Sequence, residues 1–181
     1  NKTAIQINAG LYHVCALLND YSLKCWGSNT KGQLGIGSTS EVGSSPGDMG
    51  DGLNSVDLGS GYTAKQVVAG NKHTCVLLNN GSVKCWGDHT SGQLGGGQTQ
   101  ATGDSSDELG DNLPVLDLGL PAIQISAQYD HTCAILIDNS IKCWGEGSLG
   151  RLGSGDIDNI GDEPGELSSQ SVVDLNSSEV S

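Results

Sequence analysis

The sequence predicts an all-β protein made of three repeated units. Across its 181 residues, all six cysteines, all three tryptophans and three of the four histidines occupy matching positions in three consecutive segments. The first cysteine of a unit recurs after 60 residues, from Cys15 to Cys75, and again after 58, at Cys133. Short runs of apolar or alternating residues bounded by glycine are typical of strands, and no segment shows the sustained apolar period of a long helix.

Each unit is expected to contribute four short strands. The first is a Gln-Val segment, as at 64–69, and a hairpin supplies the next two. The fourth is a short Val-Asp-Leu segment at 56–58, with counterparts at 116–118 and 172–175. Units of this kind are typical of β-propeller blades, within a ring or a larger repeat assembly. We place repeat 1 at 3–59, repeat 2 at 60–119 and repeat 3 at 120–175, with 176–181 as the start of the next linker or a tail.

The motifs within a unit come in a fixed order. Ala-Gly is followed by His-x-Cys-x-Leu-Leu, then Gly-Ser-Val-Lys-Cys-Trp-Gly and Gly-Gln-Leu-Gly, or close variants of these. This order resembles the repeat of the regulator-of-chromosome-condensation family over essentially the whole chain. The resemblance implies a propeller, usually of seven blades, each a small twisted antiparallel sheet. The chain departs from the family in having three units, long acidic linkers and a cysteine pair that the nuclear members lack.

Two repeated residue types have structural explanations. The resemblance implies that the repeated histidines serve packing or hydrogen bonding; they are His13, His73 and His131. One tryptophan per unit is expected to pack between blades, where a large ring adds much to a thin core. These are Trp26, Trp86 and Trp144. A ligand site of stacked tryptophans is the alternative.

The cysteines form a Cys-x9-Cys pair in each unit. Its members flank a hairpin, whose clearest turn is Asn79-Asn80-Gly81-Ser82, so they lie on adjacent antiparallel strands. That proximity predicts one disulfide per unit and an oxidising compartment. The pairs are Cys15 with Cys25, Cys75 with Cys85, and Cys133 with Cys143. The alternative is a zinc site, for instance from His73, Cys75 and Cys85, but zinc sites prefer closer cysteine pairs and a fourth ligand.

Composition excludes several classes of protein. The formal charge of −13 argues against binding to nucleic acid or to an anionic membrane, and no apolar run is long enough for membrane insertion. Because the chain opens without Met or a signal peptide, we expect a mature product or a fragment. Three sequons fit a secreted or cell-surface glycoprotein, and Asn80, on a predicted hairpin tip, is a better glycan candidate than Asn1 or Asn176.

No catalytic constellation or cofactor motif is evident, so we expect a protein that is not an enzyme. Calcium is the one ligand that the acidic linkers suggest, since hard cations favour oxygen-rich loops. The third linker clusters Asp156, Asp158, Asn159 and Asp162, and the second Asp104, Asp107, Glu108 and Asp111. The alternative is that these carboxylates keep the protein in solution.

Three functional hypotheses remain. The favoured one is a non-enzymatic extracellular structural or assembly protein, whose repeats pack with further repeats or with other copies of the chain into a ring, fibre or surface structure. Its alternative is a secreted propeller that binds another protein, as an adhesion or inhibitor-like module. The resemblance also implies guanine-nucleotide exchange, which the acidic charge, the cysteine pairs and the chain length disfavour.

Overall fold

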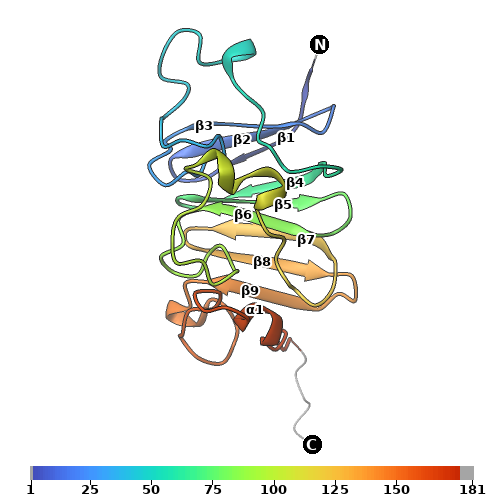
Figure 1. The fold of residues 1–181 in the computed structure, drawn as a ribbon. Coiled ribbons are helices and arrows are strands. Elements are labelled where there is room, and N and C mark those ends of the chain that lie inside the picture. The colour runs from blue at the N-terminus through green and yellow to red at the C-terminus, as the bar shows by residue number, and fades with distance from the viewer. Residues whose placement is uncertain (1, 176–181) are drawn as a thin grey trace, which may run out of the picture.

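Three antiparallel sheets, here called blades 1, 2 and 3, stack in chain order (Figure 1). The computed structural model describes residues 2–175, so Asn1, Asn176 and the predicted tail at 176–181 lie outside the described residues. Blade 1 contains β1 (Ala4–Ala9), β2 (His13–Leu18) and β3 (Leu23–Gly27). Blade 2 contains β4 (Ala64–Ala69), β5 (His73–Leu78) and β6 (Val83–Gly87). Blade 3 contains β7 (Ala122–Gln128), β8 (His131–Leu136) and β9 (Ile141–Gly145). The predicted all-β class is therefore confirmed.

The second and third strands of each blade form the predicted hairpin. In blade 2 the turn lies at Asn79–Ser82, where Gly81 has a φ of +86° and its N–H donates to the carbonyl of Leu78 at 3.0 Å. Tyr21 and Asn139 hold positive φ at the same place in the other blades. Each hairpin brings its two cysteines directly opposite one another across the strands.

The prediction of a fourth strand is wrong. The segments at 56–58, 116–118 and 172–175 lie along the outer strand of their blade, yet none of them is a strand. Each donates one backbone hydrogen bond of 2.8 Å, as from the N–H of Val56 to the carbonyl of Leu23. In the first two copies an Asp-x-Gly turn bends the chain away, because the Asp57 carboxylate accepts the N–H of Gly59 at 2.9 Å and Asp117 does the same for Gly119.

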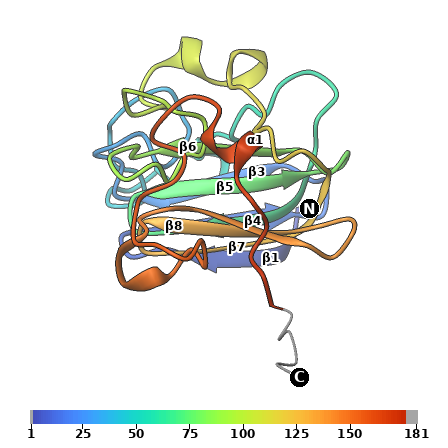
Figure 2. The ribbon, with the colours of Figure 1, turned by 90° about the horizontal axis from the view of Figure 1, so that it is seen from below.

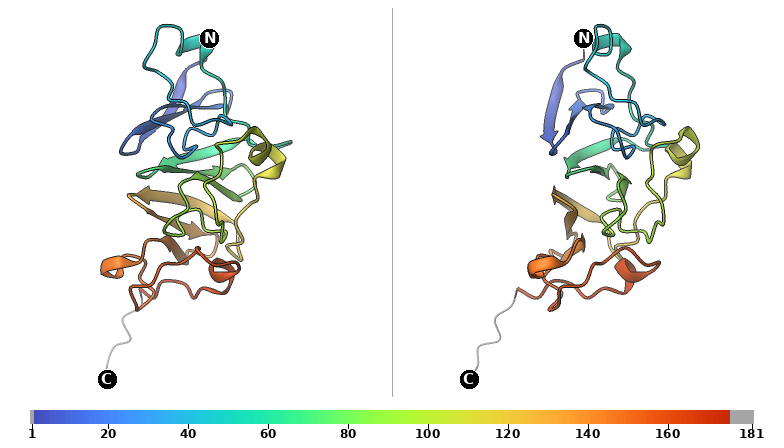
Figure 3. Two further views of the ribbon diagram at one scale, coloured as in Figure 1. Left: turned by 60° about the vertical axis from the view of Figure 1, so that its left-hand side comes forward. Right: turned by 90° about the vertical axis from the view of Figure 1, so that its left-hand side faces the viewer.

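The linkers contain only short helical turns. These are η1 (Gly50–Gly52), η2 (Ser106–Glu108), η3 (Gly110–Asn112), η4 (Ser148–Gly150) and α1 (Glu166–Ser169). Figure 3 shows the linkers after β3 and β6 on the side of the stack away from β1, β4 and β7. In every linker one carboxylate accepts two backbone N–H groups, as Glu108 does from Gly103 and Ser105, and this fixes the loop. Asp48 and Glu166 are its counterparts.

The apolar core lies between blades rather than within them. Viewed along the stack, the strands of the three blades overlie one another (Figure 2). Leu17, Leu23 and Leu34 of blade 1 form one buried cluster with Val67 and Trp86 of blade 2. An equivalent cluster joins blade 2 to blade 3. Three blades therefore make two cores, and a single blade makes none, as is typical of repeat proteins.

Disulfides join Cys15 to Cys25, Cys75 to Cys85 and Cys133 to Cys143, which is the pairing that the sequence predicts. The first two belong to the cores between blades and are almost fully buried. A disulfide here therefore closes a hairpin and also forms part of the surface on which the next blade packs.

Alkylation tests this pairing. Iodoacetamide added to the native, unreduced protein should leave its mass unchanged, because the described chain contains no free cysteine. After reduction and unfolding, six groups should be added. Six groups added to the native protein before reduction would show that the hairpins carry thiols.

Candidate assembly interface

Several kinds of polar contact fix how one blade sits on the next. The first comes from a glutamine in the first strand. The side-chain amide of Gln6 donates to the carbonyl of Val67 and accepts the N–H of the same residue, both at 3.1 Å. Gln66 repeats this double bond with Ile125 at 2.8 and 2.9 Å. The amide thus replaces a neighbouring strand and satisfies backbone groups at the sheet edge.

The second contact centres on a threonine hydroxyl. Nε2 of His13 lies 2.7 Å from Oγ1 of Thr74, and that hydroxyl donates to the carbonyl of Gln33 at 2.8 Å. The hydroxyl proton is thereby committed to the carbonyl, so His13 donates from Nε2. Between blades 2 and 3, Nε2 of His73 lies 2.8 Å from Oγ1 of Thr132.

The tryptophans seat the apolar part of the interface, and the predicted position between blades is confirmed for Trp86 and Trp144, whereas Trp26 has no blade before it among the described residues. Nε1 of Trp86 donates to the carbonyl of Gln33 at 3.0 Å, and Nε1 of Trp144 to that of Gln93 at 3.1 Å. Glycine is required beneath each ring, since a Cβ on Gly35 would lie 2.6 Å from Nε1 of Trp86. The alternative of a ligand site made of stacked tryptophans finds no support, because Trp86 and Trp144 are fully buried among protein atoms.

Burial keeps the interface histidines neutral. It lowers the pKa of His13 to about 4 and that of His73 to about 3, and His13 and His131 lower the latter further. Nδ1 of each ring is buried without a hydrogen-bond partner among the described residues, so a proton there would gain no compensating contact. The neutral Nε2–H form is also the one that the threonine contact needs.

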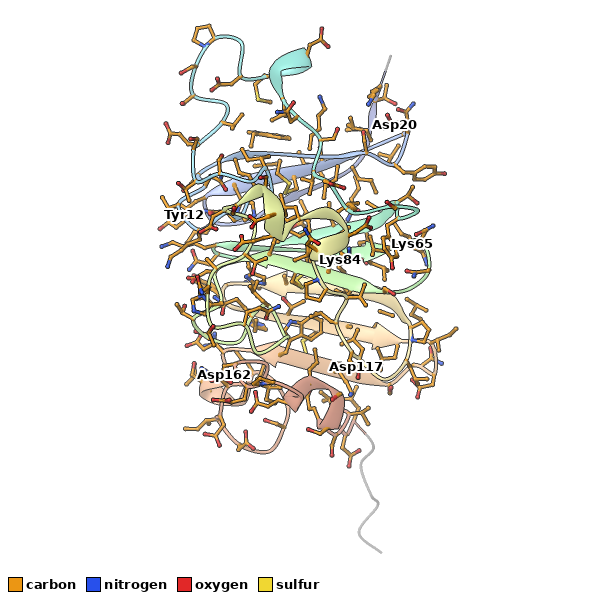
Figure 4. All side chains as sticks on the ribbon, viewed as in Figure 1. Tyr12, Asp20, Lys65, Lys84, Asp117 and Asp162 are labelled. Atoms are coloured by element: carbon orange, nitrogen blue, oxygen red, sulfur yellow. A yellow bond between two sulfur atoms is a disulfide. The ribbon has the colours of Figure 1, made fainter. Side chains whose placement is uncertain are left out.

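A buried lysine attaches the linkers to the blades, a role that the sequence analysis missed. Nζ of Lys84 donates to the carbonyls of Leu58 at 3.0 Å and Gly110 at 2.8 Å, and lies 4.8 Å from the centre of the Tyr62 ring. In Figure 4 it lies beside the helical turns of the second linker. Lys142 binds the carbonyl of Leu167 in the same way. The lysine of Lys-Cys-Trp recurs in all three units, and that recurrence is the signal that could have revealed it.

The two ends of the stack present the halves of this interface that are not used within it. Blade 1 exposes a leading face, defined by Ile7, Val14 and Trp26. Ile7 is 65% exposed, whereas Val67 and Ile125 at the same position in blades 2 and 3 are 0% and 2% exposed. The difference in exposure between these positions corresponds to the surface that a preceding blade covers.

Blade 3 exposes the complementary trailing face, defined by Gln124, His131, Gly153 and the disulfide Cys133–Cys143. Gln124 matches Gln6 and Gln66, His131 matches His13 and His73, and Gly153 matches Gly35. A largely apolar groove of about 350 Å³ runs along this face and is lined by Gln124, Cys133, Ile135, Cys143, Arg151 and Gly153, among others. Arg151 replaces the glutamine of the other units and pairs with Glu146 at 2.5 Å.

Calcium binding by the acidic linkers stays a prediction, and several of the residues proposed for it make local hydrogen bonds. Among residues 2–175, no group of three or more His, Cys, Asp or Glu side chains is arranged to hold a metal ion. Asp156 accepts Ser154 Oγ at 2.8 Å and the N–H of Asp158 at 3.2 Å, and Asp162 is exposed. In the second linker Glu108 fixes its loop as described, and Asp111 accepts two hydrogen bonds from Ser60. The alternative of a zinc site at His73, Cys75 and Cys85 fails, because the two cysteines form a disulfide with each other.

Two further predictions concern the surface and the membrane. Asn80 is exposed on its hairpin turn, where its side-chain oxygen accepts the N–H of Ser82 at 3.0 Å, and its glycosylation stays a prediction. Within the described residues, no helix is long and apolar enough to cross a membrane.

The neutral histidines make stability depend on pH. The unfolded chain, with a histidine pKa of about 6.5, binds protons between pH 6.5 and about 4 that folded His13 and His73 do not bind. Stability should therefore fall as the pH falls through this window. Asp130, whose pKa burial raises, works in the opposite direction.

We expect a lower urea midpoint at pH 4.5 than at pH 7.5. The variant His13→Gln with His73→Gln should show a smaller difference between the two midpoints, because it removes both titrating rings. A wild-type midpoint that stays level or rises on acidification would contradict the neutral interface.

Comparisons with known protein families and proteins agree with this stack of repeated blades. Two models described as "Regulator of chromosome condensation (RCC1) repeat" match the chain, one at residues 4–33, 64–93 and 122–151 and the other at 25–77. The probable E3 ubiquitin-protein ligase HERC4 of Homo sapiens is 32% identical over 149 residues, which are 82% of this chain and 13% of HERC4. Protein pim1 of Schizosaccharomyces pombe is 31% identical over 163 residues, which are 87% of this chain and 30% of pim1. The chain thus spans less than a third of these relatives.

Solved structures show the same fold. Prp20p of Saccharomyces cerevisiae is similar with a TM-score of 0.69 at 20% identity, over 97% of this chain and 39% of that one. Human WBSCR16 is similar with a TM-score of 0.70 at 23% identity, over 91% of this chain and 39% of that one. The chain therefore belongs to the RCC1 repeat family, and its three sheets are blades of the RCC1-type β-propeller.

Proposed function

We propose that the chain is a non-enzymatic structural protein that assembles by docking further RCC1-type repeats on its two end faces. One observation carries this proposal. The trailing face of blade 3 repeats the glutamine, histidine, glycine and disulfide with which blades 1 and 2 bind their successors. A face that keeps every one of these elements is equipped for the same contact.

The apolar surface at both ends supports docking. Ile7 is largely exposed on the leading face, and the 350 Å³ groove crosses the trailing face. Contiguous apolar surface of this kind is typical of interaction sites. Covering it by another repeat removes from water the same residue types that the two internal cores bury.

We place the protein in an oxidising compartment, at the cell surface or outside the cell. The support is the use of buried disulfides as parts of the cores between blades. The charge of −13 supports a partner other than nucleic acid.

A second candidate is protein binding through the turns between the first two strands of each blade. Turn residues of all three blades line a shallow groove of about 220 Å³. Leu11, Tyr12 and Tyr129 are more than half exposed beside it, and exposed aromatic residues are enriched in protein interfaces. Yeast RCC1, which has the same fold, has been solved with Kap60 bound to it.

Electron microscopy with mass spectrometry of material isolated from its source tests the proposal. We expect rings, fibres or surface structures that contain several chains. Ile7→Glu should disrupt them by placing a charge on the leading face, whereas Ile157→Glu, at a loop position that is 69% exposed, should not. Particles with both end faces bare would contradict docking, and monomeric closed rings would favour the second candidate.

A further inference from the structure

The leading faces of the three blades differ at one residue that contacts the preceding blade. Thr74 and Thr132 lie opposite Trp86 and Trp144 in their sheets, and both are fully buried. Val14 holds this position in blade 1, opposite Trp26. Valine and threonine have nearly the same shape, so the difference is essentially one hydroxyl group.

That hydroxyl satisfies the histidine of the preceding blade. It lies within 2.8 Å of the histidine Nε2 in both internal interfaces. It also sits beside the disulfide of the preceding blade, with Oγ1 of Thr74 4.0 Å from Sγ of Cys15 and Oγ1 of Thr132 3.7 Å from Sγ of Cys75. The contact is thus a three-part site made of a ring, a disulfide and an incoming hydroxyl.

The trailing face of blade 3 holds the first two parts of that site. His131 occupies the histidine position, and the disulfide Cys133–Cys143 lines the groove. Arg151 occupies the sequence position of Gln33 and Gln93, whose carbonyls accept the tryptophan N–H in the internal interfaces. What is missing is a threonine hydroxyl and an indole ring from another repeat.

We propose that the trailing face of blade 3 selects an RCC1-type repeat that carries threonine at the position of Thr74 and tryptophan at that of Trp86, and discriminates against blade 1 of a second copy. This inference rests on the proposed docking at the end faces. In such a contact blade 1 would supply the indole of Trp26 and the backbone of Ile7, but Val14 would leave Nε2 of His131 covered and without a partner. An unpaired buried donor weakens an interface by roughly tenfold or more.

The test uses self-association of the 181-residue chain, measured by sedimentation equilibrium at moderate salt to screen its charge. Val14→Thr supplies the missing hydroxyl without altering the shape of blade 1. We expect this variant to self-associate with a dissociation constant about tenfold lower than that of the wild-type chain. Val14→Ala, which adds no hydroxyl, should show no gain.

A double variant identifies the partner of the hydroxyl. Val14→Thr combined with His131→Phe should lose the gain, because the phenylalanine ring has no Nε2. A gain that survives this change, or equal self-association of the wild-type chain and Val14→Thr, would overturn the selection while leaving docking intact. If none of the chains self-associates at millimolar concentration, docking at the end faces fails, and the proposed function fails with it.

Discussion

The structure depends on apolar packing between consecutive blades. The trailing face of each of the first two blades is covered by the Trp-bearing leading face of the next blade. Cysteines that look like local staples of a hairpin become part of this shared core once the blades stack. Stability and the proposed assembly therefore involve the same kind of surface, because what holds blade 1 to blade 2 is also what the ends of the stack offer to other repeats.

Polar groups determine which arrangement of this core is adopted. Apolar faces alone would tolerate sliding, whereas the glutamine amide, the threonine hydroxyl and the indole N–H each need their hydrogen-bond partners at fixed places. Burial of the interface also requires neutral histidines and hydrogen-bonded lysines, because an unpaired buried polar group is costly. The interface thus combines apolar packing with hydrogen bonds that fix the position of one blade on the next. At Val14, blade 1 lacks the hydroxyl that makes one of these hydrogen bonds in the other blades.

Much of the fold could be predicted from the sequence, because residues that recur at the same position in every repeat reveal a shared structure. The in-register Cys, Trp and His residues predicted three β units, the hairpins and the tryptophans between blades. The prediction of a fourth strand was wrong. An alternating Val-Asp-Leu segment has the pattern of a strand, but the Asp side chain bonds the N–H of the following glycine and turns the chain instead. Calcium binding stays a prediction, because carboxylates that fix backbone N–H groups, as Glu108 does, have the same composition as metal-binding loops. The roles of Gln6 and Thr74 could not be assigned, since their partners lie on a neighbouring blade that is brought close only by stacking.

The most direct test of the account compares one substitution at two equivalent positions. Trp86 is covered by blade 1, whereas Trp26 has no blade before it in the described chain. Urea denaturation should show that Trp86→Ala lowers the free energy of unfolding by about 3–5 kcal/mol, the usual loss for a buried aromatic ring, and that Trp26→Ala lowers it much less. Equal losses at the two positions would show that the ring stabilises its own blade, and would contradict a core that exists only between blades.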